Sequence, residues 1–138
     1  MKILVVIEHD NKTVKQSSYS TITAASQICE DVEAIVLGKN LGSVAEEIKK
    51  ATHLQKVYLV DNDLFKNPLA EDLSKTLRMF VEDRNFTHVL SPSSTFGKNM
   101  SPKLATLLDV QQVSDITKII NDNTFERPIY AGNAIAKV

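Results

Sequence analysis

The sequence has few glycines and a single cysteine, and each shortage excludes a class of site. Its four glycines, at positions 38, 42, 97 and 132, are too scattered to build a glycine-rich phosphate loop, and no nucleotide-binding glycine motif occurs. Cys29 is alone, so the printed sequence contains no disulfide framework and no cysteine cage for a metal ion. The three histidines are also too far apart for a short metal-ligand spacing. We therefore predict no metal site.

Neither a large net charge nor a long apolar run is present. Sixteen basic and seventeen acidic residues give a net charge of -1, which predicts no nucleic-acid partner. No apolar run reaches the roughly 20 residues that cross a bilayer, so we predict no membrane insertion. Residues 1–10 are typical of a buried strand and its following loop rather than of a signal or transit peptide. Together with the lone cysteine they predict a bacterial cytoplasmic protein, or a mitochondrial matrix protein in a eukaryote.

What the sequence does contain is a regular alternation of strand and helix patterns. Its 138 residues are enough for one domain, and we interpret 1–138 as a single domain. Apolar runs of strand length alternate with amphipathic segments, and this order predicts an α/β fold: a mainly parallel sheet flanked by helices on both faces. The predicted strands are 2–7, 32–37, 56–60 and 88–90. The predicted helices are 19–29, a short one from 43, 67–84, and one within 99–108.

Three local signals suggest where helices begin. Ser43 and Glu46 have the spacing of a capping box, which predicts a helix start at Ser43. Asn67 followed by Pro68 is typical of a side-chain cap with proline in the first turn. Pro102 would break the interior of a helix, so we expect it in the first turn of the last one.

The C-terminal part changes character. Residues 112–121, 124–130 and 134–138 are short strand candidates, and they are joined by turn-forming residues at 121–123 and 131–133. These short segments predict antiparallel strands at the C-terminal end, added as an extension to the main sheet.

The loops that follow the strands are the candidate binding sites, because ligands of open α/β sheets lie at the carboxyl ends of the strands. Three segments should lie there: 8–10, 38–40 and 91–99. The last combines hydroxyl groups with a glycine and a lysine ahead of a helix, which suits phosphate binding, helix capping with a positive backbone angle at Gly97, or contact with a partner. The candidate ligand or interface residues are Ser93, Ser94, Thr95, Gly97, Lys98 and Asn99.

Few other residues suggest chemistry. His9 lies beside Asp10, which would suit a general base in a small hydrolase, but no nucleophile is recognisable and we assign no catalytic residue. We expect structural roles for His53 and His88. Arg127 fits either an interdomain ion pair or a solvated strand edge.

Two stretches, 91–99 continued through 107–116, and 124–135, resemble the amino-terminal half of an electron transfer flavoprotein alpha subunit. The likeness extends to 3–10, 23–25 and 44–47, and so runs nearly end to end. In fold, the matching domain of that family is similar to the adenine-nucleotide-binding, Rossmann-like α/β domains. The resemblance identifies 1–138 as the amino-terminal domain, with the FAD-binding carboxyl-terminal domain absent.

The resemblance also implies a function. The alpha subunit of this family pairs with a beta subunit, and the heterodimer carries electrons from dehydrogenases, notably acyl-CoA dehydrogenases, to a quinone oxidoreductase or another acceptor. FAD is held mainly by the carboxyl-terminal alpha domain, and AMP by the beta subunit. We therefore expect no flavin-binding residue and no bound FAD on this chain alone, and no enzyme activity of its own. The alternative is a free-standing nucleotide-binding α/β module similar to universal stress proteins.

Overall fold

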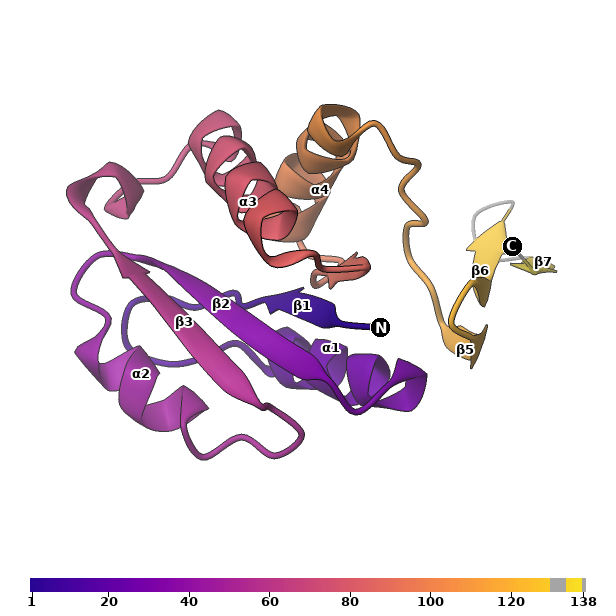
Figure 1. The fold of residues 1–138 in the computed structure, drawn as a ribbon, viewed down its shortest axis with the longest axis horizontal. Coiled ribbons are helices and arrows are strands. Elements are labelled where there is room, and N and C mark those ends of the chain that lie inside the picture. The colour runs from indigo at the N-terminus through magenta and orange to yellow at the C-terminus, as the bar shows by residue number, and fades with distance from the viewer. Residues whose placement is uncertain (130–133, 138) are drawn as a thin grey trace.

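The computed structural model describes residues 1–129 and 134–137, and its main part is a parallel sheet between two layers of helices (Figure 1). The four strands lie in the order β3-β2-β1-β4, and every pair is parallel. The α/β prediction is confirmed. The strands are β1 Ile3–Val6, β2 Val32–Gly38, β3 Lys56–Asp61 and β4 His88–Leu90. The helices are α1 Gln16–Ile28, α2 Gly42–Ile48, η1 Asp63–Phe65 (a 3-10 turn), α3 Ala70–Arg84 and α4 Thr95–Leu108.

The central strands β1 and β2 are buried along their whole length, because helices cover both faces of the sheet. Side chains alternate between the two faces of a strand, so β1 contributes to two separate cores. Ile3 and Val5 belong to the core under α1 and α2, whereas Leu4 and Val6 belong to the core under α3 and α4. Figure 1 shows these two helix pairs on opposite sides of the sheet.

Two of the predicted helix starts are wrong. Helix α2 begins at Gly42 after Leu41, and Ser43 lies inside its first turn without capping it. Helix α3 begins at Ala70, after Leu69, so Asn67 is not its cap. Both starts are set by packing of the helix on the sheet, which outweighs a local capping signal. The side chain that does cap a turn in this region is Asn62, whose Oδ1 accepts a hydrogen bond from Leu64 N at 2.9 Å.

Helix α4 also differs from the prediction. It begins at Thr95, and Pro102 lies in its interior rather than in its first turn. Proline removes one backbone donor there. The helix continues because Met100 and Leu104, on either side of the proline, are both buried in the core, while Pro102 itself is exposed. The hydroxyl of Thr106 also donates to the carbonyl oxygen of Pro102 at 3.0 Å.

The C-terminal strands are antiparallel as predicted, but they do not extend the main sheet. They form a separate three-stranded sheet in the order β5-β6-β7, which lies to one side of the main sheet (Figure 1). Residues 110–117 have no strand structure and separate the two sheets, so β5 begins later than predicted. The strands are β5 Lys118–Asn121, β6 Thr124–Ile129 and β7 Ala134–Lys137. The predicted turn at 131–133 lies outside the described residues.

A hydrogen bond joins the smaller sheet to the larger one. The Nε2 atom of His88, at the start of β4, lies 2.7 Å from the carbonyl oxygen of Asp122, in the turn between β5 and β6. No helix in the part of the chain that the structure describes is long and apolar enough to cross a membrane.

Candidate functional site

The strand order reverses between β1 and β4. The chain passes from β1 to β2 and then to β3 on one side, and it returns to the other side of β1 to form β4. In open α/β sheets this reversal opens a crevice at the carboxyl ends of the strands, where ligands bind. The loop after β1 and the loop 91–94 after β4 meet there, as the sequence predicts.

A carboxylate of the chain itself occupies this crevice. The hydroxyl of Ser94 donates to Glu8 Oε2 at 2.5 Å and accepts a hydrogen bond from the backbone N–H of Gly97 at 3.3 Å. Ser94 is therefore the N-cap of α4, and it links the first turn of that helix to the end of β1. A helix N-terminus attracts anions, and here the anion is the side chain of Glu8, in the loop after β1.

Gly97 is required for its lack of a side chain rather than for an unusual backbone angle. It lies in the first turn of α4 and is buried, and its φ is not positive, so the predicted positive angle is wrong. A Cβ atom at this position would overlap the carbonyl oxygen of Pro92. The glycine lets the helix approach the loop that precedes it. The same approach brings the hydroxyls of Ser91 and Ser101 within 2.6 Å of each other.

The other candidate residues of the loop point toward solvent. Ser93, Thr95 and Asn99 are exposed, and the ammonium group of Lys98 lies 3.8 Å from Asp115 Oδ1. The structure therefore brings only Ser94 and Gly97 into the crevice.

We predict that Ser94→Ala lowers the free energy of unfolding by about 1 kcal/mol, because it removes an N-cap acceptor. It also removes the donor to Glu8. Urea unfolding followed by circular dichroism would measure the change. The matched control is Ser93→Ala, which alters an exposed serine one position away and should change stability by less than about 0.5 kcal/mol. Equal effects of the two substitutions would contradict the capping geometry.

A second carboxylate, that of Asp61, holds the loop between β2 and α2. Asp61, at the end of β3, accepts hydrogen bonds from the backbone N–H groups of Leu41 and Asn40, both at 3.0 Å. These bonds, that of Leu41 first, lower the pKa of the Asp61 carboxyl below its usual value. Asn40 has a positive φ of 59°. Sequence reasoning did not identify Asp61, although an aspartate ending a strand was visible.

His9 and Asp10 do not form a catalytic pair. His9 Nε2 lies 2.8 Å from the carbonyl oxygen of Leu37, and the N–H of Asn11 donates to His9 Nδ1 at 3.0 Å. Because an amide N–H only donates, Nδ1 is an acceptor and the proton is on Nε2. Asp10 instead accepts from the N–H groups of Thr13 and Lys12, which lower its pKa to about 2. Both residues shape the loop after β1.

Glu47 of α2 fixes the same loop from the other side. Its Oε1 accepts from the N–H of Val14 at 3.0 Å, and its Oε2 accepts from the hydroxyl of Tyr19. Desolvation and then this hydrogen bond raise the pKa of Tyr19 to about 12. The loop is thus held by its own polar contacts.

The other residues considered from the sequence, His88, Arg127 and His53, lie outside the crevice. His88 Nδ1 lies 2.9 Å from Thr87 Oγ1, in addition to its contact with the smaller sheet. The guanidinium of Arg127 donates to Ser114 Oγ at 3.3 Å, so its proposed interdomain ion pair stays a prediction. His53 is exposed beyond α2 and has a positive φ of 72°. Among the described residues no three His, Cys, Asp or Glu side chains are grouped as metal ligands would be.

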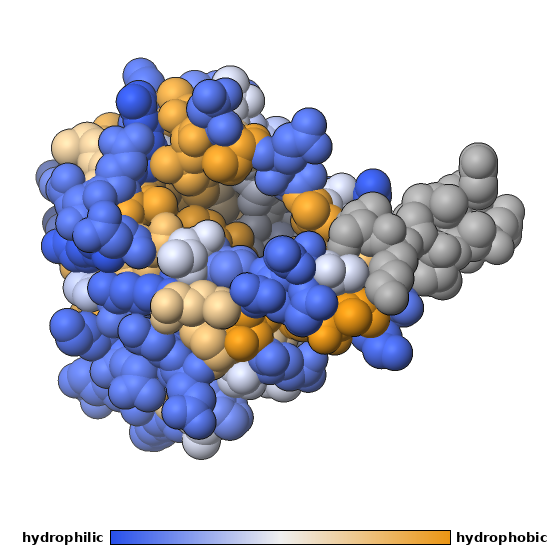
Figure 2. Space-filling view, turned by 45° about the vertical axis from the view of Figure 1, so that its right-hand side comes forward, coloured by the Kyte–Doolittle hydropathy of each residue, from blue (hydrophilic) through white to orange (hydrophobic). Residues whose placement is uncertain are grey.

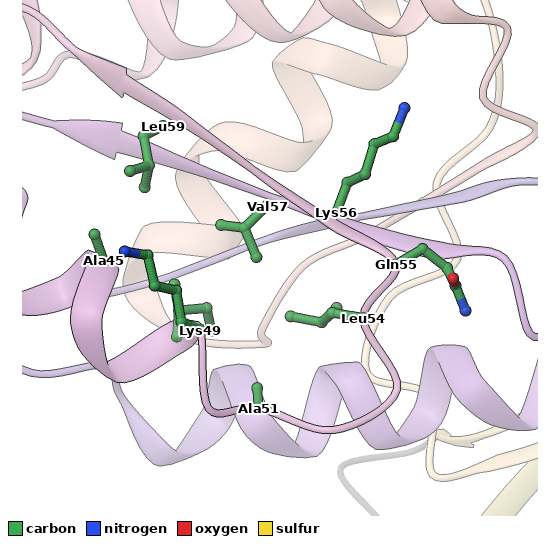
Figure 3. Close-up of a pocket in the computed structure, with 9 residues that line it drawn as sticks. Ala45, Lys49, Ala51, Leu54, Gln55, Lys56, Val57 and Leu59 are labelled. Carbon is green, nitrogen blue, oxygen red and sulfur yellow. The ribbon is translucent and has the colours of Figure 1, made fainter.

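A hollow of about 300 Å³ lies away from the crevice, between α2 and the edge strand β3 (Figure 3). Apolar residues make up most of its lining, which also includes Lys49, Gln55 and Lys56 but no carboxylate or histidine, and in Figure 3 the side chain of Lys56 points away from the hollow. It therefore has the character of a contact surface.

The fold and the crevice define a class of protein: a doubly wound α/β domain whose anion-binding positions are filled by its own carboxylates. The family model described as the electron transfer flavoprotein domain matches residues 3–138. The chain belongs to the electron transfer flavoprotein family, and the resemblance seen in its sequence is confirmed.

Several proteins similar to the chain are alpha subunits. The chain is 41% identical over 138 residues to electron transfer flavoprotein subunit alpha of Pseudomonas aeruginosa, with 100% of this chain and 44% of the relative covered. It is 40% identical over 141 residues to the mitochondrial alpha subunit of Dictyostelium discoideum, with coverage of 98% and 40%. For a probable mitochondrial alpha subunit of Caenorhabditis elegans the identity is 36% over 135 residues, with coverage of 98% and 41%. The chain thus spans less than half the length of these relatives.

Proposed function

We propose that this chain is the scaffold and interface part of an electron transfer flavoprotein alpha subunit. The observation that supports this role is its likeness to alpha subunits over its whole length. In the complete protein a carboxyl-terminal alpha domain and a beta subunit join it. The assembly then carries electrons from dehydrogenases, such as acyl-CoA dehydrogenases, to a quinone oxidoreductase or another acceptor.

We propose that FAD does not bind in the crevice of this chain. A dinucleotide places its pyrophosphate at a helix N-terminus beside free backbone N–H groups. At α4 that position faces the Glu8 carboxylate, and at α2 the N–H groups of Asn40 and Leu41 already donate to Asp61. A pyrophosphate would meet like charge at both places. We therefore propose that FAD is held by the carboxyl-terminal alpha domain.

The same two carboxylates argue against the alternative of a free-standing nucleotide-binding module. A phosphate at either loop would have to displace Glu8 or Asp61. Titration calorimetry with AMP and ATP distinguishes the two functions, and we expect no heat of binding at millimolar nucleotide. Saturable binding to the chain alone would favour the alternative.

The experiment that tests the proposed role is reconstitution. The purified chain is mixed with a beta subunit, the remaining region of an alpha subunit and FAD, and the mixture is separated by gel filtration. We expect one ternary complex that carries flavin absorbance, because each part supplies a surface that the others need. Mixtures that lack one component at a time are the controls.

Two outcomes of this reconstitution would contradict the proposal. The first is a failure of the chain to enter any complex although the other components associate. The second is tight flavin absorbance on the chain alone, which would place the cofactor site within these residues.

A further inference from the structure

Arg127 carries a buried donor group for which the described residues supply no acceptor. Among the buried side-chain nitrogen and oxygen atoms of those residues, its Nε is the one that makes no hydrogen bond. Burying an N–H group without a partner is unfavourable, and such groups are rare in folded proteins. Arg127 lies in β6, the central strand of the smaller sheet, and is half-buried as a whole. Its Nε therefore points to an acceptor outside the described residues.

The charge of Arg127 is also unmatched within the described residues. No carboxylate among them forms an ion pair with its guanidinium group. Its neighbour Glu126 lies on the other face of β6, directly opposite Lys118. Asp115, in the segment between the two sheets, pairs with Lys98. An anionic acceptor would satisfy both the buried N–H group and the charge of Arg127.

The donors around this position suit a carboxylate. The Nε–H and Nη2–H groups of a guanidinium are parallel, and together they match the two oxygens of a carboxylate. Here Nη2 already donates to Ser114 Oγ at 3.3 Å, so only Nε–H is left. Because Ser114 Oγ accepts that bond, its own O–H can still donate, and it donates to no other described residue. A carboxylate here would accept from Arg127 Nε–H and from the hydroxyl of Ser114.

Apolar side chains lie beside this donor. Phe125 shares a face of β6 with Arg127, because alternate residues of a strand point the same way, and Ile119 of β5 lies directly opposite Phe125. Both apolar residues are only partly buried, and every described residue of the two cores lies at or before Leu104. Figure 2 shows hydrophobic surface on this side of the molecule. A free anion would leave these side chains uncovered, whereas a polypeptide segment bearing Asp or Glu would cover them.

The direction of β7 indicates which polypeptide this is. Strand β7 runs antiparallel to β6, and its last residue, Lys137, lies directly opposite Glu126. The match covers only 44% of the Pseudomonas aeruginosa alpha subunit, and in the proposed complete subunit a carboxyl-terminal region follows this chain. The residues that follow β7 therefore begin beside the strand position of Arg127.

We propose that Arg127 and Ser114 together hold an aspartate or glutamate carboxylate from the region of the alpha subunit that follows this chain. The carboxylate accepts from Arg127 Nε–H and from the Ser114 hydroxyl, and its segment covers Phe125 and Ile119. The smaller sheet is thereby a docking surface for that region. The site rests on the proposed function, since a carboxyl-terminal region must follow the chain.

Isothermal titration calorimetry tests the site. The 138-residue chain is titrated into the remaining region of the Pseudomonas aeruginosa alpha subunit, whose bound FAD shows that it is folded, and separately into the beta subunit. We expect Arg127→Gln to weaken binding to the alpha region by at least about 30-fold, because it neutralises one member of a buried hydrogen-bonded ion pair. Arg127→Lys should restore binding only in part, since an ammonium group lacks the two parallel N–H donors.

Arg78→Gln is the matched control. Arg78 lies on α3, is exposed, and pairs with Glu82, so its neutralisation should change the dissociation constant by less than about twofold. The chain alone supplies a second comparison. Because Arg127 Nε has no acceptor among the described residues, Arg127→Gln should leave the urea midpoint of the chain unchanged. A clear fall in that midpoint would show that Arg127 serves the fold of the chain itself, and would overturn the site.

The binding results separate this site from the proposed function. Equal binding by the unaltered chain and by Arg127→Gln would overturn the site alone, whereas no binding of the unaltered chain to the folded alpha region would overturn both. Binding that depends on Arg127 but is seen only with the beta subunit would place the carboxylate there instead. Saturable binding of acetate or phosphate to the chain alone, lost in Arg127→Gln, would show that a free anion fills the site.

Discussion

Gly97→Ala is expected to lower the free energy of unfolding by about 2 kcal/mol, because there is no space for the added methyl group. The clash is with the carbonyl oxygen of Pro92, and Pro92 C would lie only 3.0 Å from the new atom. Backbone atoms cannot rotate away as the end of a flexible side chain can. Alanine is the better helix former by about 1 kcal/mol, and the predicted loss is what remains after that gain.

Gly42→Ala is the matched control for this substitution. Gly42 is also a helical glycine, but a Cβ atom there meets nothing within 4 Å. Alanine should leave stability unchanged or raise it by up to about 1 kcal/mol. The shift of the urea midpoint at constant slope measures both changes. A destabilisation by Gly42→Ala as large as that by Gly97→Ala would show that the close approach to Pro92 is not the cause.

Leu77→Ala should cost about 3 kcal/mol of unfolding free energy, since a buried leucine is replaced by a cavity. Leu77 lies in α3, has no exposed surface, and packs in the core that also contains Leu4 and Ile35. Much of this core holds α3 and α4 on the sheet. We therefore expect the variant to unfold in a single transition at a lower urea concentration.

Met79→Ala on the same helix separates the loss of packing from an effect of helix propensity. Met79 is two positions away and largely exposed, so its truncation should change stability by no more than about 0.5 kcal/mol. Both substitutions replace a long side chain with alanine in the middle of α3. If Met79→Ala were as destabilising as Leu77→Ala, the orientation of α3 on the sheet would be wrong.

Local patterns in the sequence predicted the order of the elements and the bounds of the four main strands well, but they placed the starts of the helices poorly. Continuous apolar runs identified the buried strands, because a strand covered on both faces needs apolar residues at every position. The starts expected at Ser43 and Asn67 failed, and Pro102 lies inside α4. Capping and proline preferences are worth about 1–3 kcal/mol each, and burial of a whole helix face outweighs them.

For the loop 91–99, the sequence predicted the location of the candidate site but not the contacts that its residues make. The sequence pointed to 91–99 and to the segment after β1, but nothing local indicates that Glu8 and Ser94 meet. These residues are 86 positions apart, and the strand order brings them together. The bond between Asp61 and Asn40 likewise depends on β3 lying beside β2. A local sequence pattern therefore does not predict which distant segment will lie beside it.

The sequence by itself determined the family and the alternation of strands and helices, because signature stretches and hydrophobic periodicity are properties of contiguous residues. Only the tertiary structure decided that the C-terminal strands form a sheet of their own and that the Glu8 carboxylate lies in the crevice between β1 and β4. Those outcomes depend on contacts between distant segments, whose free energies are set by the packing of the whole domain.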